Sequence, residues 1–205
     1  MIFWYNFLSL LIPLTTSEET FEFFKSRCDS KCTLQPYHID SESISLFPID
    51  CSSVCAYILI DQNSDLTENQ LKNYFRNMRT LYGSVKIKDT NFPSLNFLSR
   101  LETIECVPVQ LIGIINNPNL ANATFPKLKK IQSDNKFLMI FQGNHPVLLK
   151  DPNFCKSIKK QLNSTEWHAP SVDGKSCEEI EDAQSSNNQI GVLLVVMITM
   201  ILLVF

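Results

Sequence analysis

The sequence has few of the residues on which enzyme active sites depend. Its 205 residues include only three histidines and five glycines. It has no His-Glu-x-x-His zinc motif, no Gly-x-Ser-x-Gly nucleophile motif and no glycine-rich phosphate loop. Serines and acidic residues are plentiful, but no pattern singles out a Ser/His/Asp set. The sequence therefore predicts a protein that is not an enzyme.

Metal-binding and cofactor motifs are missing too. Asp61 and Asp65 flank Asn63, but the spacing and the closing glutamate of an EF-hand calcium loop are absent. His145 lies in a predicted turn, Asn-His-Pro, where a structural role is the simpler interpretation. We expect neither a cofactor nor a metal site.

An excess of positive charge is also missing. The 18 Lys and Arg residues are dispersed among 21 Asp and Glu residues, for a net charge of −3. A nucleic-acid-binding protein would need a basic face, so nucleic acid is not an expected partner. About 170 residues lie between the two apolar ends, which is enough for one domain with a sizeable core.

The two ends are the long apolar stretches of the chain. Residues 1–17 begin with MIFWYNFLSLLIPL and end in small residues, which is typical of a signal peptide cut near Ser17, although no Lys or Arg precedes the apolar run. The alternative is a buried N-terminal helix. Both ends together predict a secreted chain held at the cell surface.

The C-terminal stretch, residues 190–205, would form a helix of about 24 Å, short of the roughly 30 Å hydrocarbon core. A small, polar linker at 181–189 precedes it. This combination favours a glycosylphosphatidylinositol (GPI) anchor signal, and a short membrane helix is the alternative. The candidate attachment residues are Ser185, Ser186, Asn187 and Asp182.

Seven cysteines follow the secretory interpretation. Cys28 and Cys32, then Cys51 and Cys55, form two Cys-x3-Cys pairs that could hold zinc in a cytosolic protein, but secretion favours disulfides. A predicted helix at 18–32 would place Cys28 and Cys32 on one side. The nested pairing, Cys28–Cys55 with Cys32–Cys51, is preferred, and the crossed pairing stays open.

The remaining cysteines and two sequons concern the rest of the domain. Cys155 and Cys177 would close its other end, and Cys106 is either a buried thiol or an intermolecular partner. Asn122-Ala-Thr and Asn163-Ser-Thr are expected N-glycosylation sites.

An internal repeat organises the chain between these cysteines. Four apolar runs each end in an asparagine-containing turn and a leucine; they begin near Ala56, Ser84, Leu111 and Phe137. Alignment on the turn asparagines gives spacings of 28, 26 and 27 residues, between Asn63, Asn91, Asn117 and Asn144. A period of this size predicts stacked coils of a solenoid, with these asparagines as a structural ladder at the bend.

Other positions of the repeat are expected to fill the core. Leucines after the turn would occupy a corner: Leu66, Leu95, Leu120 and Leu148. Apolar residues at spacing three, such as Leu98-Leu101-Ile104 and Phe125-Leu128-Ile131, would line another wall.

These motifs resemble the receptor L domain, the ligand-binding module of insulin-receptor and epidermal-growth-factor-receptor ectodomains. The resemblance rests on Cys55-Ala-Tyr-Ile-Leu-Ile, Tyr82-Gly-Ser-Val-Lys-Ile, Phe97-Leu-Ser-Arg-Leu-Glu-Thr-Ile, Ile114-Ile-Asn-Asn-Pro-Asn-Leu, Pro126-Lys-Leu-Lys-Lys-Ile and the segment from Asn144 to Cys155. With one such domain and no kinase, the chain is most similar to nematode proteins that carry L domains alone. The resemblance implies a right-handed β-helix of about four leucine-rich-repeat-like coils with short helices, capped by an N-terminal helix and disulfides.

The implied domain covers residues 18–180, and the implied function is extracellular binding of a protein or peptide, such as an insulin-like or growth-factor-like ligand, or modulation of a receptor. No position-specific ligand motif is matched, so the ligand-binding residues stay unknown. Alternation along the strands suggests exposed candidates on one wall: Tyr57, Lys86, Lys88, Gly113 and Met139. A structural or adhesive surface protein is the alternative function, and the oligomeric state stays open.

Overall fold

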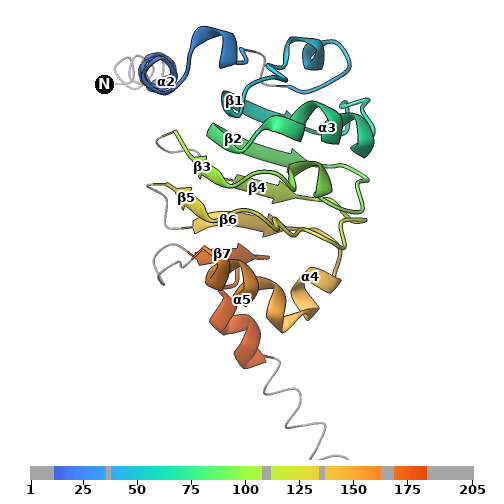
Figure 1. Cartoon of the computed structure of the whole chain (residues 1–205). Coiled ribbons are helices and arrows are strands. Elements are labelled where there is room, and N and C mark those ends of the chain that lie inside the picture. The colour runs from blue at the N-terminus through green and yellow to red at the C-terminus, as the bar shows by residue number, and fades with distance from the viewer. Residues whose placement is uncertain (1–11, 36–37, 108–111, 134–136, 163–168, 184–205) are drawn as a thin grey trace, which may run out of the picture.

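The protein is a stack of parallel strands closed at both ends by helical segments (Figure 1). The computed structural model describes residues 12–35, 38–107, 112–133, 137–162 and 169–183. The strands are β1 (Ser53–Ile60), β2 (Thr80–Lys88), β3 (Thr103–Glu105), β4 (Ile112–Ile115), β5 (Lys130–Gln132), β6 (Phe137–Gln142) and β7 (Ala169–Val172). The helical elements are α2 (Ile12–Arg27), α3 (Glu68–Tyr74), α4 (Val147–Lys150), α5 (Pro152–Gln161) and four 3-10 turns, at Ser30–Cys32, Ser43–Leu46, Phe75–Asn77 and Asn96–Leu98.

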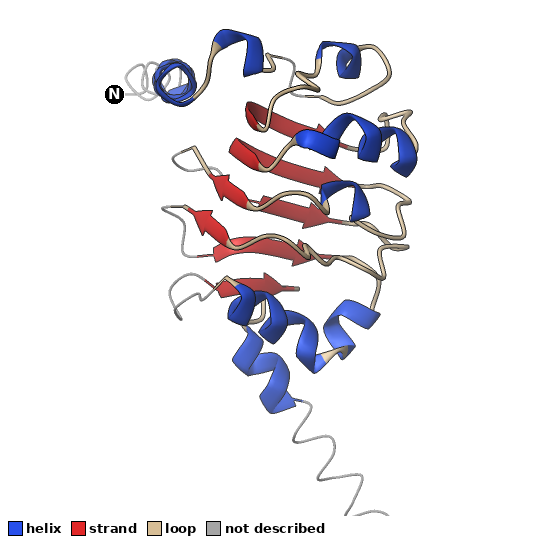
Figure 2. Ribbon diagram, in the orientation of Figure 1, coloured by secondary structure: helices blue, strands red, loops and turns tan. Residues whose placement is uncertain are grey.

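Every pair of named strands is parallel, as the repeat predicts. β2 pairs along its whole length with β1, then divides its other edge between β3 and β4. β3 continues to β5, whereas β4 continues to β6 and β7. The sheet is therefore curled into two walls: β3 and β5 belong to the front of Figure 2, and β4 and β6 lie behind them.

Gly83 lies where β2 bends from one wall to the other. Its φ is +145°, in a region that only glycine adopts without strain, and an added Cβ would come within 1.8 Å of the Ala56 carbonyl oxygen on β1. Thr80 and Lys86 of β2 pair with Thr103 and Gly113 of the next coil. The two β2 positions are six residues apart in the sequence, whereas their partners are ten apart. An insertion of four residues thus separates β3 from β4, while β2 turns the corner as one strand.

The predicted core positions are buried, except Ile131, which is partly buried against the core. Leu66, Leu95, Leu120 and Leu148 are all 6% exposed or less, as are Leu98, Leu101, Ile104, Phe125 and Leu128. Because equivalent residues of successive coils stack directly on one another, each buried column continues from one coil to the next. The parallel, solenoid-like class of the fold is confirmed; its handedness and the number of coils remain predictions.

The asparagine ladder differs from the sequence alignment at two of the four coils. Asn144 Oδ1 accepts from the backbone and side-chain amides of Asn117, at 3.1 and 3.0 Å. Asn117 Oδ1 accepts from the backbone N–H and the hydroxyl of Thr90, at 3.0 and 2.7 Å. Thr90, and not Asn91, therefore occupies the ladder, and Asn63 is exposed with its own N–H bonded to Asp61.

The residue before each ladder position explains the sharp bend. Asp89 (φ 56°), Asn116 (φ 55°) and Gly143 (φ 62°) all lie in the left-handed region, spaced 27 residues apart. Asp, Asn and Gly are the residue types that adopt this conformation most readily. The repeat in the sequence thus encodes a repeated backbone geometry at one corner of the coil.

The structure closes both ends with disulfides. It joins Cys28 to Cys55 and Cys32 to Cys51, which is the nested arrangement, and Cys155 to Cys177. The helix boundaries differ from expectation: α2 ends at Arg27, so Cys28 follows the helix and Cys32 lies in the 3-10 turn Ser30–Cys32. The peptide after the helix, and not one helical face, brings the two cysteines to the first strand.

Candidate ligand-binding surface

The outward side of β2, β4 and β6 is the exposed face of the rear wall, and we call it the strand face. Its residues form two columns across the strands: Leu59, Lys86, Gly113 and Ile140, and beside them Lys88, Ile115 and Gln142. Lys86 and Gln142 are exposed, whereas Leu59, Lys88, Ile115 and Ile140 are half-buried. Alternation places these side chains opposite the core residues Ile87, Ile114 and Phe141.

This face combines aliphatic surface with two lysines. Gly113, at the centre of the face, carries no side chain and is itself buried. Flat, partly apolar faces with a few charged groups suit contact with another protein, whereas small molecules usually need an enclosing pocket.

Of the five residues predicted to be exposed on this surface, Gly113 is buried at its centre, and two others lie elsewhere. Met139 is fully buried, because it pairs with Ile112 of the core and not with Gly113. Tyr57 is on the outward side of β1 but is half-covered by α2. A shift of one residue along a strand moves a side chain to the opposite face, which is why Ile140 and not Met139 belongs here.

Helix α2 covers the outward side of β1 and β2 near their starts. Phe24 is 8% exposed, and its ring centroid lies 5.4 Å from that of Tyr57. Thr20 Oγ1 and the Tyr57 hydroxyl are 2.9 Å apart, and Arg27 forms an ion pair of 2.6 Å with Glu105 on β3. The helix thus limits the accessible strand face to its distal half, around Lys86 and Lys88.

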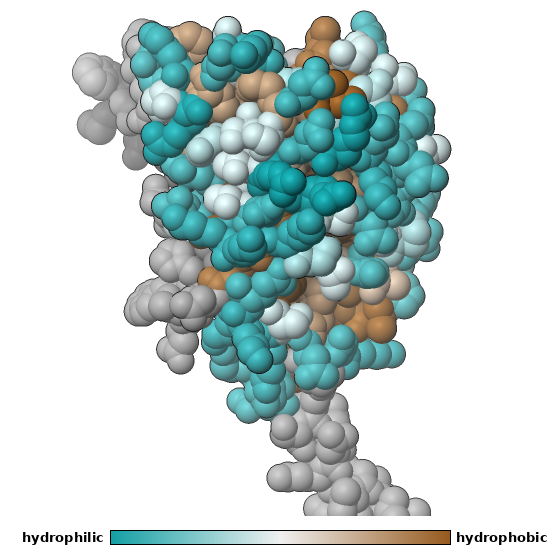
Figure 3. Space-filling view, viewed as in Figure 1, coloured by the Kyte–Doolittle hydropathy of each residue, from teal (hydrophilic) through white to brown (hydrophobic). Residues whose placement is uncertain are grey.

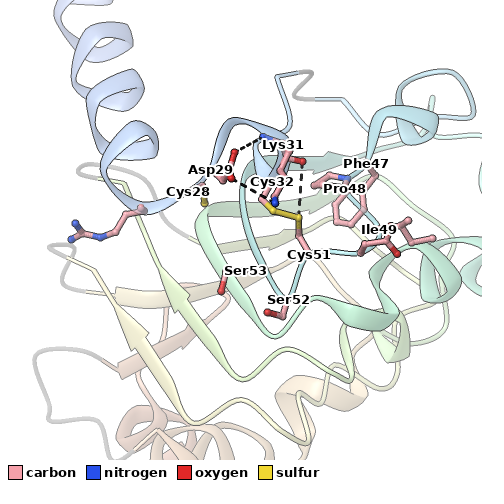
Figure 4. Close-up of a pocket in the computed structure, with 12 residues that line it drawn as sticks. Cys28, Asp29, Lys31, Cys32, Phe47, Pro48, Ile49, Cys51, Ser52 and Ser53 are labelled. Atoms are coloured by element: carbon pink, nitrogen blue, oxygen red, sulfur yellow. Dashed lines mark hydrogen bonds and ion pairs between the residues drawn. A yellow bond between two sulfur atoms is a disulfide. The ribbon is translucent and has the colours of Figure 1, made fainter.

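The segment that precedes β1, which we call the cap, borders one surface depression. The depression has a volume of about 680 Å³ and is bordered by the Cys32–Cys51 disulfide (Figure 4). Two ion pairs border it, Arg27 with Glu105 and Lys31 with Asp29 at 3.7 Å. A second depression of about 330 Å³ lies at the turns after β1 and β2, beside Asp61 and Asp89. Both are open hollows between secondary-structure elements.

His38 joins the cap to the first turn of the solenoid. Its Nε2 is 2.9 Å from Asp61 Oδ1, and its Nδ1 is 3.2 Å from Asp40 Oδ2. Burial acts to lower the pKa of His38, but hydrogen bonds to Asp61 and Asp40 outweigh it, so the pKa is raised. Hydrogen bonds from Ser43 lower the pKa of Asp40 to about 2.

Both ring nitrogens of His38 are therefore held by carboxylates. The imidazole has no nitrogen left to take a proton from a serine hydroxyl, which a nucleophilic triad requires. This cluster ties two segments of the fold together. Among the described residues, no group of three or more His, Cys, Asp or Glu side chains is arranged to hold a metal ion.

Cys106 is a buried thiol, 7% exposed. Burial raises its pKa to about 11, which keeps it protonated and unreactive at neutral pH. A thiol buried in this way is not accessible for a disulfide between two chains, which was the alternative that the sequence left open.

Other predicted features lie at the surface or outside the described residues. Asn122 is exposed, and its Oδ1 accepts from the Thr124 hydroxyl at 2.8 Å. Asn163, the start of the predicted signal peptide and the apolar tail from residue 190 lie outside the described residues. No helix in the described part of the chain is long and apolar enough to cross a membrane.

A model of the receptor L domain family matches residues 50–165, which is more than half of the chain. The match begins just before β1, runs through β6 and extends beyond α5, whereas β7 lies outside it. No curated protein matches the chain. The family is one of non-catalytic, receptor-type binding modules, and its disulfide-bonded architecture is that of extracellular proteins. The parallel curled sheet, the disulfide-closed ends and the family match together place this chain in the receptor L domain family.

Proposed function

We propose that the protein is a non-catalytic binding module of the cell surface that captures a secreted protein or peptide. Membership of the receptor L domain family carries this proposal. The strand face is the proposed contact surface, because its half-buried Leu59, Ile115 and Ile140 adjoin Lys86 and Lys88. A partner with apolar side chains and a few carboxylates would complement it.

Insulin-like and growth-factor-like peptides are the ligand classes we propose, bound either to sequester them or to assist a receptor. The test is a binding assay of the purified protein against a panel of such peptides. Lys86→Glu and Gln142→Glu place negative charge at exposed positions of the strand face, and Lys72→Glu on α3 is the matched control. We expect at least tenfold weaker binding in the first two variants only. Absence of binding at micromolar peptide by a folded protein would contradict the proposal.

We further propose that the protein reaches the surface by a cleaved signal peptide, residues 1–17, and is retained by a GPI anchor added near Ser185. The polar linker and short apolar tail support this. Thr20, Phe24 and Arg27 contact Tyr57 and Glu105, and all three follow Ser17 in the chain, so cleavage near Ser17 would leave these contacts in place. Release of the protein from cells by a phosphatidylinositol-specific phospholipase is the expected result, and retention would favour a membrane helix.

A further inference from the structure

The front wall gathers positive charge that is scattered along the sequence. Six cationic residues make up this surface, which we call the basic strip: Arg79, Arg100, Lys127, Lys129, Lys130 and Lys160. The register aligns Thr80 with Thr103 and Thr103 with Lys130. The segments that precede these residues therefore lie side by side. Each contains one buried apolar residue flanked by outward-facing residues, and these buried residues are Met78, Leu101 and Leu128.

Hydrogen bonds attach α5 to the same wall. The side-chain amide of Gln161 donates to the carbonyls of Phe125 and Leu128, both at 2.6 Å. The last turn of the helix, with exposed Lys160, is thus held against the end of the strip. In Figure 3 the front face between α3 and α5 is predominantly hydrophilic.

Within the described part of the chain, most of the cations in the strip have no ion-pair partner. Glu102 is the one carboxylate that the described residues place in ion-pair contact with it, at 2.7 Å from Arg79 and 3.2 Å from Lys129. Those two cations still expose 55% and 75% of their side chains. Arg100, Lys127, Lys130 and Lys160 are also exposed. Six cations and one carboxylate form a locally positive surface on a chain whose net charge is −3.

We propose that the basic strip binds a sulfated glycosaminoglycan chain. Neighbouring coils are about 4.8 Å apart, so cations on successive coils lie within a Debye length of about 8 Å and attract one polyanion together. A linear chain can follow the stack from one coil to the next. The disulfides place the domain outside the cell, where nucleic acid and the anionic cytoplasmic leaflet are not its neighbours.

The strip and the strand face lie on opposite walls of the curled sheet (Figures 1 and 2). A polysaccharide on the front wall would leave the rear wall open to a protein ligand. The strip therefore adds a second binding activity that does not depend on the proposed peptide ligand.

The experiment measures retention of the purified full chain on immobilised heparin in 0.15 M salt. The test variant carries Lys127→Ala, Lys129→Ala and Lys130→Ala. The matched control carries Lys25→Ala, Lys31→Ala and Lys175→Ala, which removes the same charge from exposed positions elsewhere. We expect the test variant to lose affinity by about tenfold or more, and the control by less than threefold. Glu102→Gln should strengthen retention, because it removes the negative charge within the strip.

Equal weakening of both triple variants would overturn the proposal, because only net charge would then matter. No retention of the natural protein would overturn it as well. A DNA duplex and phosphatidylserine vesicles are the comparison probes. If either binds the strip as tightly as heparin does, the assignment to a sulfated polysaccharide is wrong. Unchanged thermal unfolding of the variants shows that a loss of binding is not a loss of folding.

Discussion

Asn117 is the residue whose loss should most clearly test the ladder at the bend of the coils. Its side chain is fully buried and makes four hydrogen bonds, two accepted from Thr90 and two donated, to the Ile87 carbonyl at 3.1 Å and to Asn144 Oδ1 at 3.0 Å. In Asn117→Ala, Asn144 Oδ1 keeps its bond from the Asn117 backbone N–H. The Thr90 N–H and the Ile87 carbonyl lose their side-chain partner.

A buried polar group left without a partner costs about 1–3 kcal/mol. Two such groups give an expected loss of roughly 3 kcal/mol or more in the free energy of unfolding, unless water enters the site. A domain of this kind is stable by only about 5–15 kcal/mol, so the change should be large and easy to measure. Urea unfolding followed by circular dichroism, with disulfides intact, gives the value.

Asn91→Ala is the matched control. Asn91 is exposed, and its side chain accepts one long contact of 3.5 Å from Asn119. We expect a change within about 0.5 kcal/mol. If Asn91→Ala destabilises the protein as much as Asn117→Ala, the register that assigns Thr90 to the ladder is wrong.

Three further outcomes follow from the geometry. Gly83→Ala should destabilise the protein by more than the 1–3 kcal/mol of backbone strain alone, because the new Cβ would also meet the Ala56 carbonyl oxygen at 1.8 Å; a thermal shift within error would refute the bend. Because the pKa of His38 is raised in the folded protein, its ion pairs stabilise the fold fully below pH 6.5, and this stabilisation is lost as the pH rises through the folded-state pKa. His38→Gln should remove this pH dependence of the free energy of unfolding. Parallel plots of stability against pH for the two proteins would contradict the assignment to His38. Cys106 should resist alkylation by iodoacetamide at pH 8 in the native protein and react after denaturation without reduction; rapid labelling of the native thiol would contradict its burial.

The sequence was sufficient for those features that depend on residue type and spacing. The 27-residue period predicts stacked coils. The corner leucines and most of the spacing-three apolar residues are core residues in the structure, and Ile131 is partly buried. The order of the cysteines along the chain limits the simple pairings at the cap to two, and the structure contains the nested one. These features depend on local pattern, so one sequence contains enough information to predict them.

Features that depend on register could not be read with the same certainty. Asn91 is a better match by residue type than Thr90, yet the pairing of Lys88 with Ile115 aligns Thr90 with Asn117. Met139 was placed on the wrong face for the same reason, since a shift of one residue exchanges core and surface. No pattern in the sequence predicts how many residues each coil has at its corner.

The sequence by itself determined the class of fold, its disulfide-rich ends and the absence of recognisable catalytic motifs. Only the tertiary structure decided which side chains share a surface: α2 covers Tyr57, and the stacking of coils gathers Arg100, Lys127 and Lys130 on one wall. The physical reason is that core positions are selected by burial along each coil, whereas surface neighbours come from different coils. Their proximity is set by strand register and by the insertion between β3 and β4, which are properties of the folded chain.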